Sequence, residues 1–320
     1  MVLNSVNFVV FGDPAIAAEL GKKGTSTDIA IYDRKTSDTV FTWTVPLTFP
    51  DKIQPLMQAA NIGEYAILNV AKLDRFLGEQ ILALDYVGIK DGFVLHSYEV
   101  DREKLRALLK NTSLAGYQFL DSVDQLKMEM SKLQPKKTEG PALIPVDHAF
   151  DVKGVGTVIL GVVKQGSIKV YDELDLLPSP SSSPAGKKKV LVKSIQMHDD
   201  PVEGASSPAR VGLAVKGVSA ADVSRGDVLC APGAAQVSQG TLSARFAKSP
   251  FFKGDIAENQ TYMLSVGMQI RPVKVRLAGG GGDSLEITPE KPLVYLPGQP
   301  CVLLKPDSPT TRIIGKGTFA

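Results

Sequence analysis

From residue 5 to about residue 135, short apolar runs alternate with longer segments in which apolar residues recur every three or four positions. The apolar runs are typical of buried strands: NFVVFG, DIAIYD, TVFTWTV, YAILNV, GFVLH and GYQFLD. Helices are expected between them, in DPAIAAELG, PDKIQPLMQAAN, LDRFLGEQILALDYVG, DREKLRALLK and SVDQLKMEMSKL. In the last helix, Ser122 and Gln125 have the spacing of a capping box. This alternation predicts an α/β domain with a mainly parallel sheet over residues 1–138.

Residues 134–145 (QPKKTEGPALIP) break this pattern with proline, glycine and charge, as an interdomain linker does. After them, turn residues separate short strand-like runs: VDHAF, GTVILGVVKQG, DELDLLP, KKVLVKSIQM, ARVGLAVKGV and GDVLCAP. We therefore expect an all-β barrel domain over residues 139–233 and a C-terminal β-barrel over residues 234–320, joined through APGAAQVSQG. LPSPSSSPAGKKK and GGGGD are predicted to be a hairpin loop and a flexible turn.

The composition is that of an ordinary globular protein, with 43% hydrophobic and 22% charged residues. A net charge of only +2 means that contacts with nucleic acid must come from local patches, and we expect no DNA partner. Cys230 and Cys301 are too few for a disulfide framework or metal cage, so they are expected to be buried free thiols. The N-terminus lacks the basic region of a signal peptide, and no apolar stretch approaches the roughly 18 residues that span a bilayer. We expect a cytoplasmic protein without a membrane partner.

The middle of the chain resembles a known family. The stretches ALIPVDHAFDVKGVGTVILGVVKQGSIKVYDELDLLP and VLVKSIQMHDDPVEGASSPARVGLAVKGVSAADVSRGDVLCAP resemble the second domain of translational GTPases of the elongation factor Tu type. Their phrasing is most similar to the selenocysteine-specific elongation factor branch. The last domain matches more loosely, through its β pattern and TTRIIGKGTF, and the first domain matches in skeleton. The resemblance implies a G domain with a P-loop skeleton followed by two β-barrels.

The family's phosphate loop has the form G-x-x-x-x-G-K-[ST], whose amides surround phosphate, whose lysine reaches the outer phosphates and whose hydroxyl ligates magnesium. Counted from Gly12, the last three positions are Ala17, Ala18 and Glu19, so the lysine and the hydroxyl are missing. Asp13 is expected to cap the following helix with its carboxylate. Pro14, expected at the first helical position, supplies no N–H. The later GKKGT does not restore the motif.

Two further nucleotide motifs are altered in the same way. The family's D-T-P-G-H aligns with TVPLT, Thr44 to Thr48, which lacks the magnesium aspartate, the glycine and the histidine. The guanine-reading N-K-x-D aligns with HSYE, His96 to Glu99, where a glutamate replaces the aspartate and no lysine stands beside it. We therefore expect no cofactor, with GTP and Mg²⁺ as the alternative that the family implies.

Positive evidence for an enzyme is missing from the sequence, although the family's activity is GTP hydrolysis. His96, His148 and His198 do not have metal-ligand spacing, and no metal site is expected. Asp199 and Asp200, which follow His198, are interpreted as turn formers. The motifs of hydrolases with a serine or cysteine nucleophile do not occur.

Several basic and glycine positions are candidates for contact with RNA or a protein partner, because the family grips aminoacyl-tRNA across its three domains. Solvated surface charge is the alternative interpretation of each lysine. Val155 stands where the family often has arginine. The candidates are Lys22, Lys23, Gly154, Gly156, Thr157, Lys187, Lys188, Lys189, Arg210 and Lys216.

Three functions remain open at this point. The first is a non-catalytic paralogue of a translation elongation factor that binds tRNA, the ribosome or a translation protein without GTP hydrolysis. The second is a GTPase of translation with an unorthodox nucleotide site. The third is a structural protein–protein adaptor without RNA contact.

Overall fold

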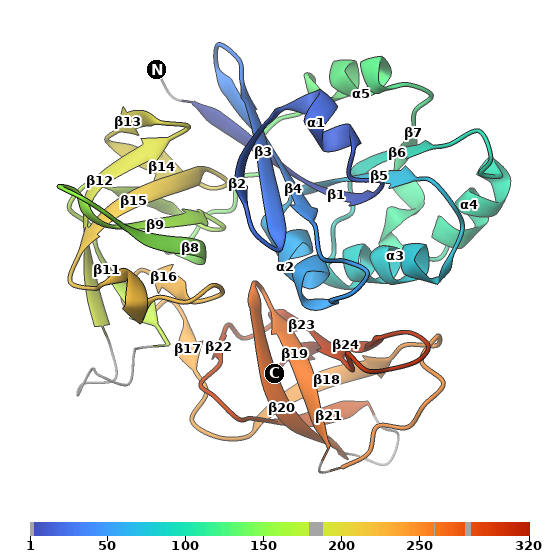
Figure 1. Cartoon of the computed structure of the whole chain (residues 1–320). Coiled ribbons are helices and arrows are strands. Elements are labelled where there is room, and N and C mark those ends of the chain that lie inside the picture. Colours follow the sequence, from blue (N-terminus) through green and yellow to red (C-terminus); the bar gives the residue numbers. More distant parts are fainter. Residues whose placement is uncertain (1–2, 179–187, 259, 279–282) are drawn as a thin grey trace.

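The computed structural model describes residues 3–178, 188–258, 260–278 and 283–320. It shows an α/β domain and two β-barrels (Figure 1), as the sequence predicts. Residues 179–187 and 279–282, which include most of the predicted hairpin loop and flexible turn, lie outside the described ranges. No helix among the described residues is long and apolar enough to cross a membrane.

A seven-stranded sheet in the order β2-β3-β4-β1-β5-β6-β7 forms the centre of the first domain. Strands β4, β1, β5, β6 and β7 are parallel, and β3 pairs antiparallel with β4. The bounds are β1 Asn4–Gly12, β2 Lys22–Ser26, β3 Ile29–Lys35, β4 Thr39–Pro46, β5 Tyr65–Val70, β6 Gly92–His96 and β7 Gln118–Phe119. The sequence pattern missed β2, an exposed edge strand without an apolar run. Basic residues are common on such edges because they discourage pairing with another chain.

Helices cover both faces of this sheet. They are α1 Ile16–Leu20, α2 Gln54–Ile62, α3 Arg75–Val87, α4 Arg102–Leu109 and α5 Val123–Met130, with a 3₁₀ turn, η1, at Ser113–Gly116. Ser122 caps α5, because its hydroxyl accepts a hydrogen bond from the amide of Gln125 at 3.2 Å. The Gln125 side chain accepts from the amide of Asp121 instead of Ser122, so the predicted capping box is only half formed.

The middle domain is a barrel, since β11 pairs with both β12 and β16 and closes the order β11-β16-β8-β9-β15-β12. Its strands are β8 Leu143–Val152, β9 Gly156–Val162, β10 Ser167–Lys169, β11 Glu173–Leu177, β12 Lys188–Met197, β13 Asp200–Val202, β14 Gly204–Ser206, β15 Arg210–Lys216 and β16 Val228–Cys230, with a 3₁₀ turn, η2, at Ala220–Asp222. Residues 134–142 precede β8 without helix or strand. The linker residue Lys136 is fixed to the first domain by Asp91, 2.5 Å away.

The C-terminal domain is a closed barrel in the order β18-β21-β20-β19-β23-β24. Its strands are β18 Leu242–Lys248, β19 Thr261–Val266, β20 Gln269–Ala278, β21 Ser284–Pro289, β23 Pro300–Leu304 and β24 Ile313–Phe319. The pair β17 (Gln236–Val237) and β22 (Val294–Tyr295) lies beside it. Cys230 and Cys301 are buried free thiols, as predicted, and burial raises the pKa of Cys301 to about 12.

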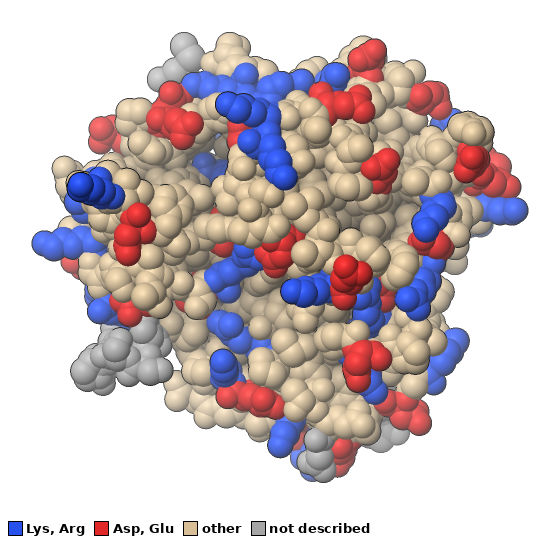
Figure 2. Space-filling view, in the orientation of Figure 1, with Lys and Arg blue, Asp and Glu red and all other residues tan. Residues whose placement is uncertain are grey.

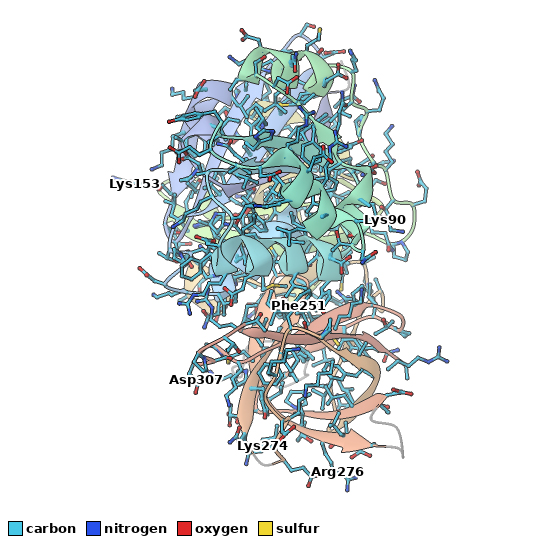
Figure 3. All side chains as sticks on the ribbon, turned by 90° about the vertical axis from the view of Figure 1, so that its right-hand side faces the viewer. Lys90, Lys153, Phe251, Lys274, Arg276 and Asp307 are labelled. Carbon is cyan, nitrogen blue, oxygen red and sulfur yellow. The ribbon has the colours of Figure 1, made fainter. Side chains whose placement is uncertain are left out.

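Apolar packing continues from the first domain into the C-terminal barrel. Leu56 and Ile81, from α2 and α3, belong to one buried cluster with Leu304 and Ile313 of that barrel. Figure 3 shows the helices of the first domain directly above the barrel, with Phe251 at the boundary. The barrel therefore supports the helical layer behind the sheet edge that holds the candidate nucleotide motifs.

Candidate functional site

The turn after β1 lies tightly against the end of β5. The amide of Asp13 donates to the Asn69 carbonyl at 2.8 Å, and the Asn69 side chain donates to the Asp13 carbonyl at 3.1 Å. Gly12 has a φ of +88°, and a Cβ there would lie 1.9 Å from the Asn69 oxygen. Only glycine fits this approach.

The amides that a phosphate would need are engaged within the turn. The amide of Ala15 donates to the Asp13 carboxylate at 3.0 Å, that of Ala17 to the Pro14 carbonyl and that of Ala18 to the Ala15 carbonyl, both at 3.1 Å. Helix α1 begins at Ile16, so the prediction that Asp13 is its N-cap and Pro14 its first residue is wrong by two positions. The reason is that residues 14 and 15 form a turn, with hydrogen bonds between each carbonyl and the amide of the third residue onward, before the α-helix begins. The Asp13 carboxylate still occupies an amide, as expected.

The residues at the other positions of the nucleotide motifs lie in different surroundings. Ala17 is buried in the core, whereas Ala18 and Glu19 are exposed. Thr44 is buried inside the sheet, and no described residue pairs with the Thr44 or Thr48 hydroxyl. His96 Nδ1 lies 2.9 Å from the Ser97 carbonyl, and Glu99 accepts a hydrogen bond from Tyr98 at 3.1 Å. These groups do not converge on a common point.

Replacing Gly12 by alanine is expected to lower the free energy of unfolding by about 3 kcal/mol, because the new methyl group meets the Asn69 carbonyl in a left-handed backbone. Gly88 is a matched control: its φ is also +88°, but a Cβ there would meet nothing within 4 Å. Gly88→Ala should cost only about 1 kcal/mol. Urea denaturation of both variants measures the difference, and equal losses would contradict the close approach at Gly12.

A hollow of about 530 Å³ lies between the sheet and the middle barrel. Ser5, Thr42 and Asp33 line it from the sheet, and Val155 and Gln196 from the barrel. The Ser5 and Thr42 hydroxyls are buried and have no hydrogen-bond partner within the described ranges. We name this hollow the interdomain cavity. Its polar atoms and apolar barrel face suit an amphipathic ligand.

The glycine turn beside this cavity is a tight hairpin. Gly154 and Gly156 have φ values of +83° and +101°, which supports the interpretation that they permit the barrel turn. Val155 between them is 41% exposed and faces the cavity. Thr157 is buried, and its hydroxyl lies 2.8 Å from Asp151 Oδ1 and 3.0 Å from the Val218 carbonyl. The turn therefore presents Val155 to the cavity, while Thr157 is held inside the barrel.

Arg210 lines the cavity while pairing with Asp147, which is only 3% exposed. Burial alone would raise the pKa of Asp147, but the Arg210 charge and the hydrogen bonds from His148 and Arg210 lower it to about 2. The cation is thus already neutralised in the barrel wall. It holds the wall in shape and leaves little charge for a ligand.

The other basic candidates occupy two separate regions. Lys22 and Lys23 are exposed on β2, and Figure 2 shows Lys and Arg side chains gathered over β2 and β3. Lys216 pairs in register with Leu191 and so lies at the end of the barrel where Lys188 and Lys189 begin β12. Lys189 forms an ion pair of 2.8 Å with Asp175. Lys187 lies outside the described residues.

Histidine and aspartate side chains join the first domain to the middle barrel. His198 Nε2 lies 2.9 Å from Asp33 of β3, and Lys35 pairs with Asp200. Asp199 lies in the turn between β12 and β13, as its residue type suggested, whereas Asp200 begins β13, and this turn docks on the sheet. Nowhere in the described ranges do three or more His, Cys, Asp or Glu side chains cluster so that they could hold a metal ion.

Charged clamps that the sequence did not indicate connect every pair of domains. Arg225 of the middle barrel pairs with Asp28 at 2.5 Å, and Arg271 of the C-terminal barrel with Asp227 at 3.2 Å. Arg312 of the C-terminal barrel makes a buried pair with Glu79 of α3. The only available signal was the motif TTRIIGKGTF, which contains Arg312 but does not identify its partner.

Lys164 joins the middle barrel to the first domain, where its ammonium donates to the Ile62 carbonyl at 2.9 Å. Burial lowers the pKa of Lys164 to about 8, although nearby Glu64 opposes this shift. Between pH 8 and 10.5 the unfolded chain therefore binds more protons at this site than the folded chain. We expect the free energy of unfolding to gain about 2–3 kcal/mol over this window. Urea titrations at several pH values measure the gain, and Lys164→Met should lack it; an identical pH slope in the variant would contradict the assignment.

The comparisons with known proteins agree with this architecture. A family model described as Elongation factor Tu domain 2 matches residues 156–230. MJ0325, an uncharacterized protein of Methanocaldococcus jannaschii, is 33% identical over 305 residues, which cover 94% of this chain and 95% of that protein. The selenocysteine-specific elongation factor of the same organism is 26% identical over 250 residues, covering 70% of this chain and 51% of that factor. The chain thus spans about half the length of that factor.

Solved structures show the same fold. Elongation factor SelB from Methanococcus maripaludis, in complex with the GTP analogue GPPNHP, has a TM-score of 0.82 at 23% identity and covers 100% of this chain and 79% of its own. A bacterial selenocysteine-specific elongation factor has a TM-score of 0.82 at 19% identity, with 100% and 58% covered. The domain-2 family model, the partly aligned selenocysteine-specific elongation factor and the shared fold show that this chain belongs to the family of translational GTPases similar to elongation factor Tu and SelB.

Proposed function

We propose that this chain is a non-catalytic member of its family, which binds the acceptor end of a tRNA without a GTP-driven switch. The observation that carries the proposal is the turn after β1. Asp13 fills an amide with its own carboxylate, Asn69 ties the turn to β5, and Pro14 has no amide. A phosphate at this turn would meet a carboxylate and few free donors, the reverse of what helix-terminus phosphate sites offer.

The domain contacts support a protein with one arrangement of its domains. In a nucleotide switch, contacts to the γ-phosphate and magnesium order segments that are released on hydrolysis. Here the segment after β4 is held by Arg312, which donates to the Pro50 carbonyl at 2.6 Å and lies over the Phe49 ring at 5.4 Å. This clamp comes from the C-terminal barrel and is made by protein groups alone. This arrangement suits a protein that is always able to bind its partner better than one switched by GTP hydrolysis.

The interdomain cavity is the proposed site for the tRNA end, as the family resemblance implies. Apolar side chains such as Val155 and Val158 can pack on a base, and the exposed Gln196 carboxamide can bond to ribose or an amino-acid group. The lysines of β2 border the Gly24–Thr25 side of the cavity and supply charge for phosphates. RNA binding is therefore expected to depend on salt.

The test is a titration of the full chain with fluorescently labelled tRNA at several salt concentrations. Lys22→Glu combined with Lys23→Glu should weaken binding at least about tenfold and reduce the salt slope, by about one for each lost phosphate contact. Lys274→Glu is the control, since Lys274 lies at the end of the C-terminal barrel that points away from the first domain (Figure 3). Equal weakening by the control, or no binding of tRNA at low salt, would reject the proposal and favour a protein partner.

A further inference from the structure

Another hollow, of about 380 Å³, opens at the C-terminal edge of the sheet. It lies between the first turn of α3 and the segment after β4. Its walls are mainly apolar and include Phe49, Pro50, Val70 and Leu77. The rings of Phe49 and Phe76 meet edge to face, with their centroids 6.0 Å apart. We name it the edge cavity. Its volume is within the range of small-molecule sites, roughly 300–1,000 Å³.

One polar side chain in this apolar wall faces the cavity without a protein partner in the described ranges. Gln80 of α3 lines the edge cavity and is only 7% exposed, yet its carboxamide makes no hydrogen bond to any residue that the structure describes. Other buried glutamines do not share this state: Gln58 donates to the Met268 carbonyl at 3.1 Å, and Gln269 to the Val294 carbonyl at 2.7 Å. The side chain is held by the surrounding helix and wall while its carboxamide is open only to the cavity, so its donor and acceptor are available to a group that enters there.

The charges at the mouth argue against an anion. Asp74 occupies the first amides of α3, because its carboxylate accepts from Phe76 and Leu77, both at 2.9 Å. Lys72, the only cation among the lining residues, lies 3.1 Å from Asp74 and is thereby neutralised. Asp13 adds a second carboxylate to the lining. A phosphate or carboxylate ligand would meet repulsion at this entrance.

We propose that the edge cavity binds a small uncharged molecule with a flat apolar body and one carboxamide group that pairs with Gln80. The apolar body replaces water that the phenylalanine and aliphatic walls cannot hydrogen-bond, and an amide group satisfies both the donor and the acceptor of Gln80. This inference is independent of tRNA binding. It assigns an uncharged ligand to this edge of the sheet, whereas one structure of the same fold is solved in complex with a GTP analogue.

Benzamide and benzoate are suitable probes, because they share size and shape and differ in charge. In ¹H–¹⁵N spectra of the full chain, benzamide is expected to shift the Gln80 side-chain amide and the Gly12 and Leu77 backbone amides in a saturable manner. Benzoate should bind at least about tenfold more weakly because of the two carboxylates. Non-saturable shifts, or equal affinity for the two probes, would overturn the proposal.

Gln80→Leu tests the paired amide directly. The variant should weaken benzamide binding about tenfold or more, whereas Gln118→Leu, at an exposed position on β7, should leave it unchanged. Unchanged affinity in Gln80→Leu would place benzamide elsewhere and overturn the proposal. If Gln80→Leu does not fold, the shift of the wild-type Gln80 amide still decides the matter.

Discussion

Replacing Arg312 by methionine is expected to lower the free energy of unfolding by about 3–5 kcal/mol, because it leaves Glu79 buried without its counter-charge. The Arg312 backbone amide and guanidinium both donate to the Glu79 carboxylate, at 2.8 Å and 3.0 Å. Arg312 and Glu79 are only 8% and 3% exposed. Urea denaturation measures the loss. Small-angle scattering should also show a larger radius of gyration once the C-terminal barrel separates from α3.

Two controls separate this clamp from an ordinary ion pair. Arg276 makes a similar two-contact pair with Glu286, at 3.0 Å and 2.6 Å, but on the exposed surface of the same barrel. Arg276→Met should leave the unfolding midpoint unchanged within error. The double variant Arg312→Leu, Glu79→Leu should recover most of the lost stability, since no buried charge remains. A small effect of Arg312→Met would contradict the clamp.

Arg210→Met is the second substitution with a large expected effect, about 3–5 kcal/mol at pH 7, because Asp147 would remain charged inside the barrel wall. Asp147 lies at the start of the strand pair that supports the glycine turn, so the loss should also loosen the interdomain cavity. Chemical denaturation measures the first effect. Hydrogen exchange of the amides in β8 and β9 measures the second.

The pH dependence of this variant identifies the cause. In the wild type the pKa of Asp147 is lowered to about 2 from the ordinary aspartate value of 3.8, so the unfolded chain binds more protons between these values. Stability from this pair is present above about pH 4 and is lost as the pH falls towards 2. Without Arg210, burial raises the pKa, and protonation on acidification relieves the penalty. The difference between variant and wild type should therefore shrink at low pH; a constant difference would contradict the mechanism.

Much of the fold was predictable because the local spacing of apolar residues distinguishes strands from helices. The runs from NFVVFG to GFVLH became β1 to β6 with small shifts at their ends, apart from β2. Strand β2 has no such pattern, since a sheet edge exposes both faces and only its pairing with β3 defines it. The clamps escaped prediction for a different reason. Glu79 and Arg312 are 233 positions apart, and nothing local in either segment identifies the other.

The candidate site was only partly predictable. The sequence alone showed that Ala18 and Glu19 replace the lysine and the hydroxyl residue of the phosphate-loop motif. It also showed that Pro14 has no N–H to donate. The role of Asn69 was not predictable, because a polar residue near the end of a strand has many possible partners. The same holds for Gln80, whose lack of a partner appears only when α3 is packed against the sheet. Whether a polar side chain has a hydrogen-bond partner depends on the folded structure and cannot be read from the neighbouring sequence.

The most direct test of a translation-factor fold without a nucleotide switch is a titration of the full chain with fluorescent GTP and GDP, with magnesium and then with chelator. We expect no saturable binding up to near-millimolar protein, where the free energy of binding would be only about −4 kcal/mol. Micromolar, guanine-selective binding that is lost on chelation would contradict the account. The turn from Gly12 to Ala18 would then have to open to receive phosphate, and the chain would be a working switch.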